Sequence, residues 1–240
     1  AFLRCTFTAN TADDGGAAAF AALDTCTLSS NTASGHGGAL YACAATRCVL
    51  RDNTALFGGA AFSSALANAL LTRNTAAQSG GGLYNGTATN CTLVANTAAD
   101  AGGGLWGGTA VNTLFYANTA AAGADHTDAS ALLYSRSAPL AAGTGNTAAL
   151  PRFRNADSGD YSLLSHSPCA NAGLSAAAPP GTDLNGNPRV QGTAVEIGAY
   201  ELDPSVIDYY GFEQWLHRNG LPIEPQTQFS LDHDSDGIPN

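Results

Sequence analysis

The clearest chemical pattern in the sequence is a group of oxygen donors within residues 232–240. Three aspartates occupy alternate positions there, and a glycine follows them and permits a tight turn. Calcium is a hard cation that takes oxygen ligands from loops of this kind. The pattern predicts a calcium site with the ligands Asp232, Asp234, Asp236, Ile238 through its carbonyl oxygen, and Asn240. The position of a final bidentate glutamate falls beyond Asn240, so we expect weak binding by this chain, and the alternative is a solvated acidic tail.

A second candidate group is charged. Arg51 and Asp52 are adjacent, and Arg73 follows them after one period of the repeat described below. A carboxylate beside two cations can take part in acid–base chemistry, so these three residues are the candidate catalytic patch. The sequence favours the alternative, an ion pair on the surface, which contributes little to the free energy of unfolding.

A third group lies in the polar segment that contains Asp125, His126 and Asp128. Carboxylate and imidazole groups can bind a metal ion or exchange protons. The spacing of these three residues matches no ligand motif, and no further partner stands nearby in the sequence. We therefore expect a solvated turn at this place.

The elements that must position these residues come from a repeat. The tripeptide Asn-Thr-Ala returns every 21 or 22 residues, with its asparagine at Asn10, Asn31, Asn53, Asn74, Asn96 and Asn118. Before each asparagine, small or apolar residues alternate with mostly polar ones, which is the pattern of a half-buried strand. After it, most repeats have a glycine pair and an apolar-aromatic end, as in residues 37–41. One such unit cannot bury its apolar face alone, so the units must stack.

We therefore expect an all-β fold, a right-handed parallel β-helix of about six coils of 21–22 residues, with a C-terminal β cap and a short terminal helix. A leucine-rich repeat has a similar period, but glycine, threonine and asparagine occupy the places where it would need good helix formers. Stacked asparagine amides can hydrogen-bond to one another and to turn backbone groups. The right-handed form follows from the usual crossover of parallel strands.

Changes of pattern along the chain divide it into four predicted segments. They are the coils at 1–137, the last coil and cap at 138–203, a short helix and linker at 204–231, and the truncated calcium-binding loop at 232–240. Within the cap, we expect Arg189 to form an ion pair with Asp183 or Glu196 that holds the cap together, with substrate binding as the alternative.

Six cysteines raise the question of disulfides. Four of them stand five residues before a repeated asparagine, in one inward column: Cys5, Cys26, Cys48 and Cys91. A disulfide needs a dihedral angle near 90°, which parallel stacked side chains do not provide, and a column does not converge on a zinc ion. We expect buried free thiols in this column, while the pairing of Cys43 and Cys169 stays open.

The charge of the chain excludes some partners. It has 9 arginines, no lysine and 19 acidic residues, for a formal net charge of -10. Nucleic acids and anionic membranes bind clustered cations, which this sequence lacks, so we expect neither partner. We also find no bilayer-spanning segment and no export signal. Because the first residue already lies inside a repeat, we expect a fragment of a longer protein.

The segment after the coils shows a recognisable pattern. Its residues are Asp160, Tyr161, Leu163, Ser167, Pro168, Cys169, Gly173, Asp183, Gly186, Arg189, Ile197, Gly198, Ala199, Tyr200 and Glu201. On these residues, the segment resembles the C-terminal part of the choice-of-anchor Q domain proteins, with Glu196 in place of the commoner aspartate.

Two further resemblances follow from short motifs. The coils, with Gly-Gly-x-Leu-Tyr and Cys-Thr-x-x-x-Asn-Thr-Ala, resemble the repeats of polymorphic outer-membrane proteins. Residues 232–240 resemble both an EF-hand loop and a thrombospondin type 3 repeat, in which the three aspartates are ligands. Together these resemblances imply a right-handed parallel β-helix in an exported, surface-associated bacterial protein.

The sequence therefore favours an extracellular or cell-surface protein, associated with the outer membrane, with a structural or adhesive role. Its Thr- and Ser-rich strand faces would contact a polysaccharide or cell-surface glycan, and calcium is the expected cofactor. The alternative is a carbohydrate-active enzyme, a polysaccharide lyase or hydrolase that acts on one face of the β-helix. Such an enzyme needs clustered carboxylates with a base beside them, and the outward columns do not offer such a cluster.

Overall fold

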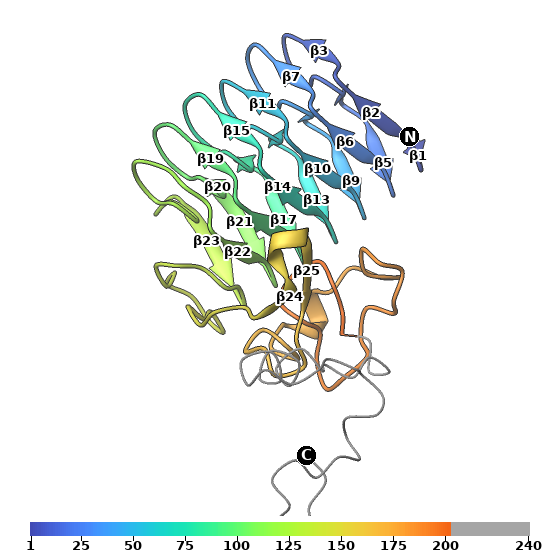
Figure 1. The fold of residues 1–240 in the computed structure, drawn as a ribbon, viewed down its shortest axis with the longest axis vertical. Coiled ribbons are helices and arrows are strands. Elements are labelled where there is room, and N and C mark those ends of the chain that lie inside the picture. Colours follow the sequence, from blue (N-terminus) through green and yellow to red (C-terminus); the bar gives the residue numbers. More distant parts are fainter. Residues whose placement is uncertain (203–240) are drawn as a thin grey trace, which may run out of the picture. The chain divides into compact units, whose positions relative to one another are not determined.

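A computed structural model describes residues 1–202, and in it the chain winds into a parallel β-helix (Figure 1). Four parallel sheets, named A to D in the order in which the chain visits them, run along the stack. Every strand pairs in register with the equivalent strand of the next coil. The predicted all-β, right-handed parallel β-helix of about six coils is confirmed. The predicted terminal helix lies outside the described residues.

Sheets A and B have strands of two to four residues. Sheet A contains β1 (Phe2–Leu3), β5 (Ala22–Asp24), β9 (Ala44–Thr46), β13 (Ala65–Ala67), β17 (Thr87–Thr89), β21 (Gly108–Val111) and β23 (Ser130–Leu133). Sheet B contains β2 (Thr6–Thr8), β6 (Thr27–Ser29), β10 (Val49–Arg51), β14 (Leu70–Thr72), β18 (Thr92–Val94) and β22 (Leu114–Tyr116). The middle residue of each sheet B strand faces inward, as its alternating pattern predicts.

Sheets C and D have strands of two residues, one facing inward and one facing outward. Sheet C contains β3 (Thr11–Ala12), β7 (Thr32–Ala33), β11 (Thr54–Ala55), β15 (Thr75–Ala76) and β19 (Thr97–Ala98). Sheet D contains β4 (Ala18–Ala19), β8 (Leu40–Tyr41), β12 (Ala61–Phe62), β16 (Leu83–Tyr84) and β20 (Leu105–Trp106). In sheet C, the alanines of β7, β11, β15 and β19 are buried, and the threonines of all five strands are exposed.

Each of the first five coils turns at four corners, and one residue at each corner has a positive φ. In the second coil these residues are Thr25, Ser30, Gly37 and Ala42, with φ between 50° and 64°. The left-handed conformation costs a residue with a side chain about 1–2 kcal/mol. The hydrogen bonds that each corner makes to the next coil must offset that cost, as in the bond from the Thr25 N–H to the Thr46 carbonyl at 3.0 Å.

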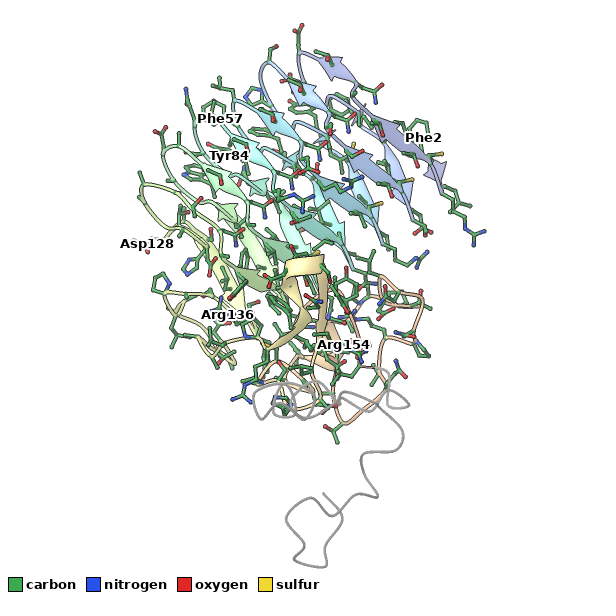
Figure 2. All side chains as sticks on the ribbon, in the orientation of Figure 1. Phe2, Phe57, Tyr84, Asp128, Arg136 and Arg154 are labelled. Atoms are coloured by element: carbon green, nitrogen blue, oxygen red, sulfur yellow. The ribbon has the colours of Figure 1, made fainter. Side chains whose placement is uncertain are left out.

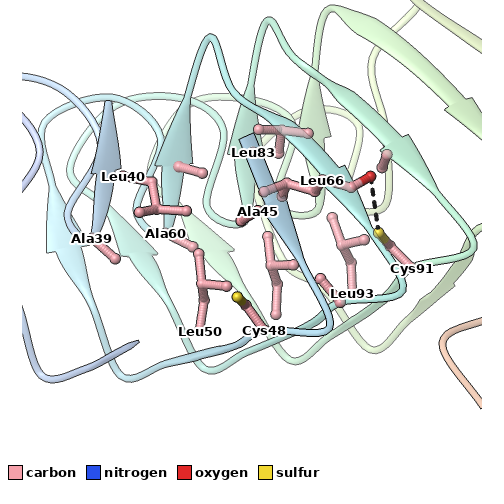
Figure 3. Packing of buried hydrophobic residues seen from close by; sticks show 14 of the residues in the cluster. Ala39, Leu40, Ala45, Cys48, Leu50, Ala60, Leu66, Leu83, Cys91 and Leu93 are labelled. Atoms are coloured by element: carbon pink, nitrogen blue, oxygen red, sulfur yellow. Dashed lines mark hydrogen bonds between the residues drawn. The ribbon is translucent and has the colours of Figure 1, made fainter. Parts of the chain in front are cut away.

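Leucine and alanine side chains from all four sheets fill the interior of the stack. Figure 3 shows Leu40, Leu50, Leu83 and Leu93 pointing into this core from successive coils. Each of the four is 0% exposed. Burying a leucine side chain contributes about 1.5–3 kcal/mol, so the repeated leucine column is the main source of stability in the coils.

The repeated asparagines form a continuous ladder along the turn between sheets B and C. Each side-chain carbonyl accepts two hydrogen bonds from the preceding rung, as Asn74 Oδ1 does from Asn53 N at 3.0 Å and Asn53 Nδ2 at 2.9 Å. Asn74 Nδ2 also donates to the carbonyl oxygen of Leu50 at 3.0 Å. These buried amides therefore have partners on both sides, which is the structural role that their spacing predicts.

All six cysteines are free thiols, and five of them are buried. In the inward column, each thiol donates to a backbone carbonyl, as Cys91 Sγ does to Leu66 at 3.5 Å (Figure 3). Thr113 takes the same place one coil later and donates to the Ala88 carbonyl at 3.0 Å. The predicted buried thiols are therefore observed, and Cys43 and Cys169 are unpaired as well.

After the coils, residues 151–202 form the cap, with elements that lie beside sheet B. These are β24 (Phe153–Asn155), the 3₁₀ turn η1 (Ala156–Ser158), β25 (Asp160–Leu163) and the 3₁₀ turn η2 (Ser175–Ala177), and β24 pairs antiparallel with β25. Apolar residues on the outer face of sheet B, such as Leu70, Val94 and Leu114, pack against Tyr161 and Leu163. The cap therefore covers the side of the stack, which explains why this outer column is less polar in the later coils.

Candidate functional site

The candidate catalytic patch is a cluster of ion pairs on the outer surface. Arg73 donates two hydrogen bonds to Asp52, of 2.8 and 3.1 Å, and Arg51 Nη1 lies 3.3 Å from Asp52 Oδ2. The Arg73 guanidinium lowers the pKa of Asp52 below its ordinary value. Asp52 is therefore ionised at neutral pH with both oxygens engaged, and a catalytic role for the patch stays a hypothesis.

The predicted calcium ligands Asp232, Asp234, Asp236, Ile238 and Asn240 lie outside the described residues. Within residues 1–202, no three histidine, cysteine, aspartate or glutamate side chains form a group that could hold a metal ion. The calcium site therefore stays a prediction from the sequence.

The expectation of a solvated turn at Asp125 is wrong, because this carboxylate is 3% exposed. Its Oδ1 accepts a 2.9 Å hydrogen bond from Asn118 Nδ2, where the next asparagine of the ladder would stand. Its Oδ2 accepts a backbone N–H at 2.7 Å and lies 3.5 Å from Arg136 Nη1. His126 is half-buried, and Asp128, which Figure 2 labels, is exposed. Asp125 therefore ends the asparagine ladder.

The predicted partner of Arg189 is also wrong. Arg189 Nη2 lies 3.2 Å from Glu201 Oε1, whereas Asp183 accepts hydrogen bonds from three backbone N–H groups. Burial, with the carboxyl of Glu196 beside it, raises the pKa of Glu201 to about 10. Arg189, Glu196 and Glu201 are each at most 3% exposed, so this cluster holds the cap together and offers no open site.

Sheet D carries one aromatic side chain on its outer surface in each of four coils: Tyr41, Phe62, Tyr84 and Trp106. In the first coil, Phe20 lies at the corner that follows sheet D. From Tyr41 to Trp106, neighbouring rings are parallel within 13° and their centroids are 5.7, 4.9 and 4.2 Å apart. Phe57 meets Tyr84 edge to face at 5.4 Å, and both are labelled in Figure 2. The result is an aromatic stack along the surface of the β-helix.

A groove of about 320 Å³ follows the aromatic stack, where sheet D turns into sheet A. It crosses three coils and is lined by Ser63, Ser64, Ala65, Asn85, Gly86, Thr87, Gly108 and Thr109. A Cβ atom at Gly86 would lie 2.3 Å from the Ser64 carbonyl oxygen, and one at Gly108 would lie 2.1 Å from that of Gly86. The close approach of the coils thus requires glycine at these two positions, whereas Ser64 at the equivalent place in the preceding coil keeps a buried side chain.

The polar side chains around this groove are available for a ligand. Ser63, Asn85, Thr87 and Thr109 are exposed, and none of them makes a side-chain hydrogen bond within residues 1–202. Between residues 53 and 124 the sequence has two charged residues, Arg73 and Asp100, and neither lines the groove. The groove therefore presents hydroxyl and amide groups without a net charge.

Sheet C presents a second polar column. One threonine of each coil is exposed and in register with the next: Thr11, Thr32, Thr54, Thr75, Thr97 and Thr119. Thr97 and Thr119 are joined by a 3.0 Å hydrogen bond between their hydroxyl groups. This column forms a Thr-rich strand face along sheet C.

Comparison with known proteins gives one family match. Residues 25–43 match the Chlamydia polymorphic membrane protein repeat. No curated protein and no solved structure shows significant similarity to the chain. The match covers one repeat of the β-helix, and within the described residues no helix is long and apolar enough to cross a membrane.

The matched stretch corresponds to three sides of the second coil, β6, β7 and β8. It holds one copy of each structural element: Leu28 in the core, Asn31 in the ladder, and Tyr41 in the aromatic stack. At Gly38 a Cβ atom would lie 2.2 Å from the carbonyl oxygen of Gly59. The repeat motif is thus the set of residues that lets one coil pack on the next.

The sequence could reveal the aromatic stack but not the groove. An aromatic residue ends the glycine-rich segment in several repeats, and that spacing places the rings in one column. The groove depends on Ser63, Asn85 and Thr109, which differ in type and come from three coils. That these residues line one groove becomes visible once the coils are stacked.

Proposed function

We propose that this chain is the β-helical part of an exported, surface-exposed bacterial protein with a structural or adhesive role, and that its outer faces bind glycans. The match to a polymorphic membrane protein repeat is the observation that supports the surface role. Glycan binding is supported by the exposed threonine column of sheet C and by the aromatic stack of sheet D. Sugar-binding sites combine aromatic surface with a few oriented polar groups.

The architecture supports the structural part of this role. Each coil contacts its neighbours through ladders of backbone hydrogen bonds, asparagine amides and leucine side chains. A stack of this kind lengthens by adding coils without a new core. Such a rod is suited to hold a binding surface away from the cell.

A polysaccharide lyase or hydrolase is the alternative function. Glycoside hydrolases mostly use a pair of carboxyl groups on either side of the scissile bond. The exposed patch offers one carboxylate, Asp52, and that group is held between Arg51 and Arg73. The geometry of residues 1–202 therefore supports binding better than cleavage.

The test is to incubate the purified chain with immobilised neutral and acidic polysaccharides and to record both retention and cleavage. We expect retention without cleavage, and the heat-denatured chain is the control for nonspecific adsorption. Cleavage that Arg73→Ala abolishes would instead establish the enzymatic alternative. If the chain neither binds nor cleaves any member of the panel, the proposed glycan binding is wrong.

Calcium is part of the proposal as a cofactor. The support is the alternation of Asp232, Asp234 and Asp236 with Gly237 after them. Titration calorimetry with calcium should show weak binding by this chain, and Asp234→Asn should remove it. Equal heats for the two proteins would contradict the proposed ligands.

A further inference from the structure

The groove between sheets D and A combines an open hollow with unpaired polar side chains, and the aromatic stack of sheet D runs beside it. Its volume of about 320 Å³ lies at the lower end of the range of ligand pockets, which is roughly 300–1,000 Å³. Because it crosses three coils about 4.8 Å apart, it is about 10 Å long and runs along the stack. This shape suits a short stretch of a linear chain better than a compact ligand.

The chemistry of the groove selects for uncharged hydroxyl-rich ligands. Ser63, Thr87 and Thr109 offer hydroxyl groups that can both donate and accept, and Asn85 offers an amide that does the same with two separate atoms. Sugar hydroxyl groups need partners of this dual kind. An anionic ligand would need a cation, and no arginine lines the groove.

The aromatic stack adds an apolar edge. Tyr84 and Trp106 directly precede Asn85 and Gly107, so each ring stands one residue before the corner where the groove begins. Trp106 stacks on Tyr84 at 4.2 Å with one face, and its other face is directed toward the next coil, where Thr127 follows in register. The half-buried ring therefore presents its edge at the surface. A ring at this place can contact the C–H groups of a sugar while the polar side chains bind its hydroxyls.

From this combination we infer that the groove between sheets D and A is a binding site for a neutral polysaccharide chain that lies along the stack. Asn85 and Thr109 bind sugar hydroxyl groups, and Trp106 contacts a pyranose ring. The inference rests on the proposed glycan-binding function and adds its location and the class of glycan.

The other coils explain why the site is confined to this part of the stack. At the same corner, the second coil has Ala42, Cys43 and Ala44 in place of Asn85, Gly86 and Thr87. Cys43 is buried with its thiol 3.3 Å from the Tyr41 carbonyl oxygen. The corner of the second coil therefore lacks the polar side chains of the groove, and a buried cysteine stands in place of the glycine.

The experiment compares variants that leave the backbone unchanged. Asn85 has a φ of 50°, so Asn85→Gly removes the amide and keeps a residue that adopts this conformation readily. Thr109→Val removes a hydroxyl group and keeps the shape of the side chain. The matched control is Thr144→Val, which removes an exposed threonine hydroxyl outside the groove and outside sheets C and D. Thermal unfolding of all four proteins checks that each is folded.

Binding is measured by titration calorimetry with cellohexaose and mannan as neutral probes and polygalacturonate as the acidic probe. We expect the wild-type chain to bind a neutral probe. The affinity should be about tenfold lower in Asn85→Gly and in Thr109→Val, because each substitution removes one hydrogen bond to the ligand. Thr144→Val should bind within about twofold of the wild type.

Two results overturn the inference and leave glycan binding in place. One is neutral-probe binding that survives both groove substitutions, and the other is binding of the acidic probe alone. Absence of binding to any probe by the folded wild-type chain overturns the inference and the proposed glycan binding together.

Discussion

The coils and the cap bury polar groups of different kinds. In the coils, identical neutral amides repeat along the stack, and the side chain of each rung is the partner of the next, as Asn74 is to Asn53. In the cap, ionisable residues are buried once each, as where Arg189 Nη2 lies 3.2 Å from Glu201 Oε1. A repeat supplies every polar group with a copy of itself as a partner, whereas a single-copy segment needs specific charged partners.

This difference predicts different sensitivity to mutation. A substitution in one coil disturbs contacts to the coils on both sides, because each inner coil is packed between two others. A buried charge cluster instead makes stability depend on pH, because its protonation differs between the folded and unfolded chains. The four predictions below test this contrast.

The largest effect is expected from Gly59→Ala. A Cβ atom at Gly59 would lie 2.4 Å from the Gly81 carbonyl oxygen and 2.6 Å from that of Thr75, so two coils would have to separate. We expect a loss of about 3 kcal/mol or more in the free energy of unfolding, measured by urea denaturation.

Its matched control in the cap is Gly186→Ala. Gly186 has a φ of 92° and nothing within 4 Å of its added Cβ atom, so only backbone strain of about 1–2 kcal/mol is expected. Equal losses for the two variants would show that close packing of the coils is not the reason for the glycine.

The second prediction concerns the asparagine ladder. Asn74→Ala removes the acceptor of two hydrogen bonds from Asn53 and leaves the Leu50 carbonyl without its side-chain donor. Since unpaired buried groups cost about 1–3 kcal/mol, we expect a loss of about 2–3 kcal/mol by urea denaturation. Asn10→Ala, at an exposed rung, should cost below about 1 kcal/mol. A similar loss at both positions would contradict the cooperative ladder.

The third prediction concerns the cap. The pKa of Glu201 is raised from 4.5 to about 10, first by burial and then by Glu196. The folded chain therefore keeps a proton that the unfolded chain releases, and the free energy of unfolding falls as the pH rises from about 4.5 to about 10. Glu201→Gln has no such proton to lose, so its unfolding midpoint should change less between pH 5 and pH 9, about the range where that proton matters.

Asp52→Asn serves as the control for this measurement. The pKa of Asp52 is lowered by Arg73, so the contribution of this carboxylate is lost only when the pH falls below its ordinary value. Between neutral and alkaline pH the control should follow the wild type. A slope in Glu201→Gln that equals the wild-type slope would assign the pH dependence to other groups.

The smallest effect is expected from Arg73→Ala. Its side chain is 51% exposed and its ion pair with Asp52 is screened by solvent. We expect a change below about 1 kcal/mol in the free energy of unfolding, and a smaller change in high salt. A loss as large as that of Asn74→Ala would show that surface charges stabilise the coils as much as the amide ladder does.

Much of the fold could be predicted because the repeat makes the pattern redundant. The columns of Leu28 and Asn31 recur in every coil, so an apolar period and an amide period are each seen several times. The corners were hidden from sequence reasoning, because many left-handed positions are occupied by residues such as Arg47, Ser63 and Ala95, which do not favour that conformation. Backbone pairing between coils forces these residues into it.

The candidate site could be predicted less well than the fold. The charged residues Arg51, Asp52 and Arg73 are conspicuous in the sequence and lie together, but they neutralise one another. The groove has no charged residue and no motif, so nothing in the sequence marks Asn85 and Thr109 as neighbours of one hollow. Asp125 shows the same limit, because nothing in its polar segment indicates that this carboxylate takes the place of an amide in the ladder.

The residues alone determine the single coil: its period, its inward leucine, its asparagine and its glycine corner. These features depend on contacts between equivalent residues one period apart, and periodicity displays such contacts directly. The position of the cap is different, because it is set by single contacts such as the hydrogen bond from Asn68 to the Thr182 carbonyl, 114 residues away. A contact that occurs once leaves no period in the sequence, so the side of the stack that the cap covers, and the groove that stays open, are decided by the folded chain.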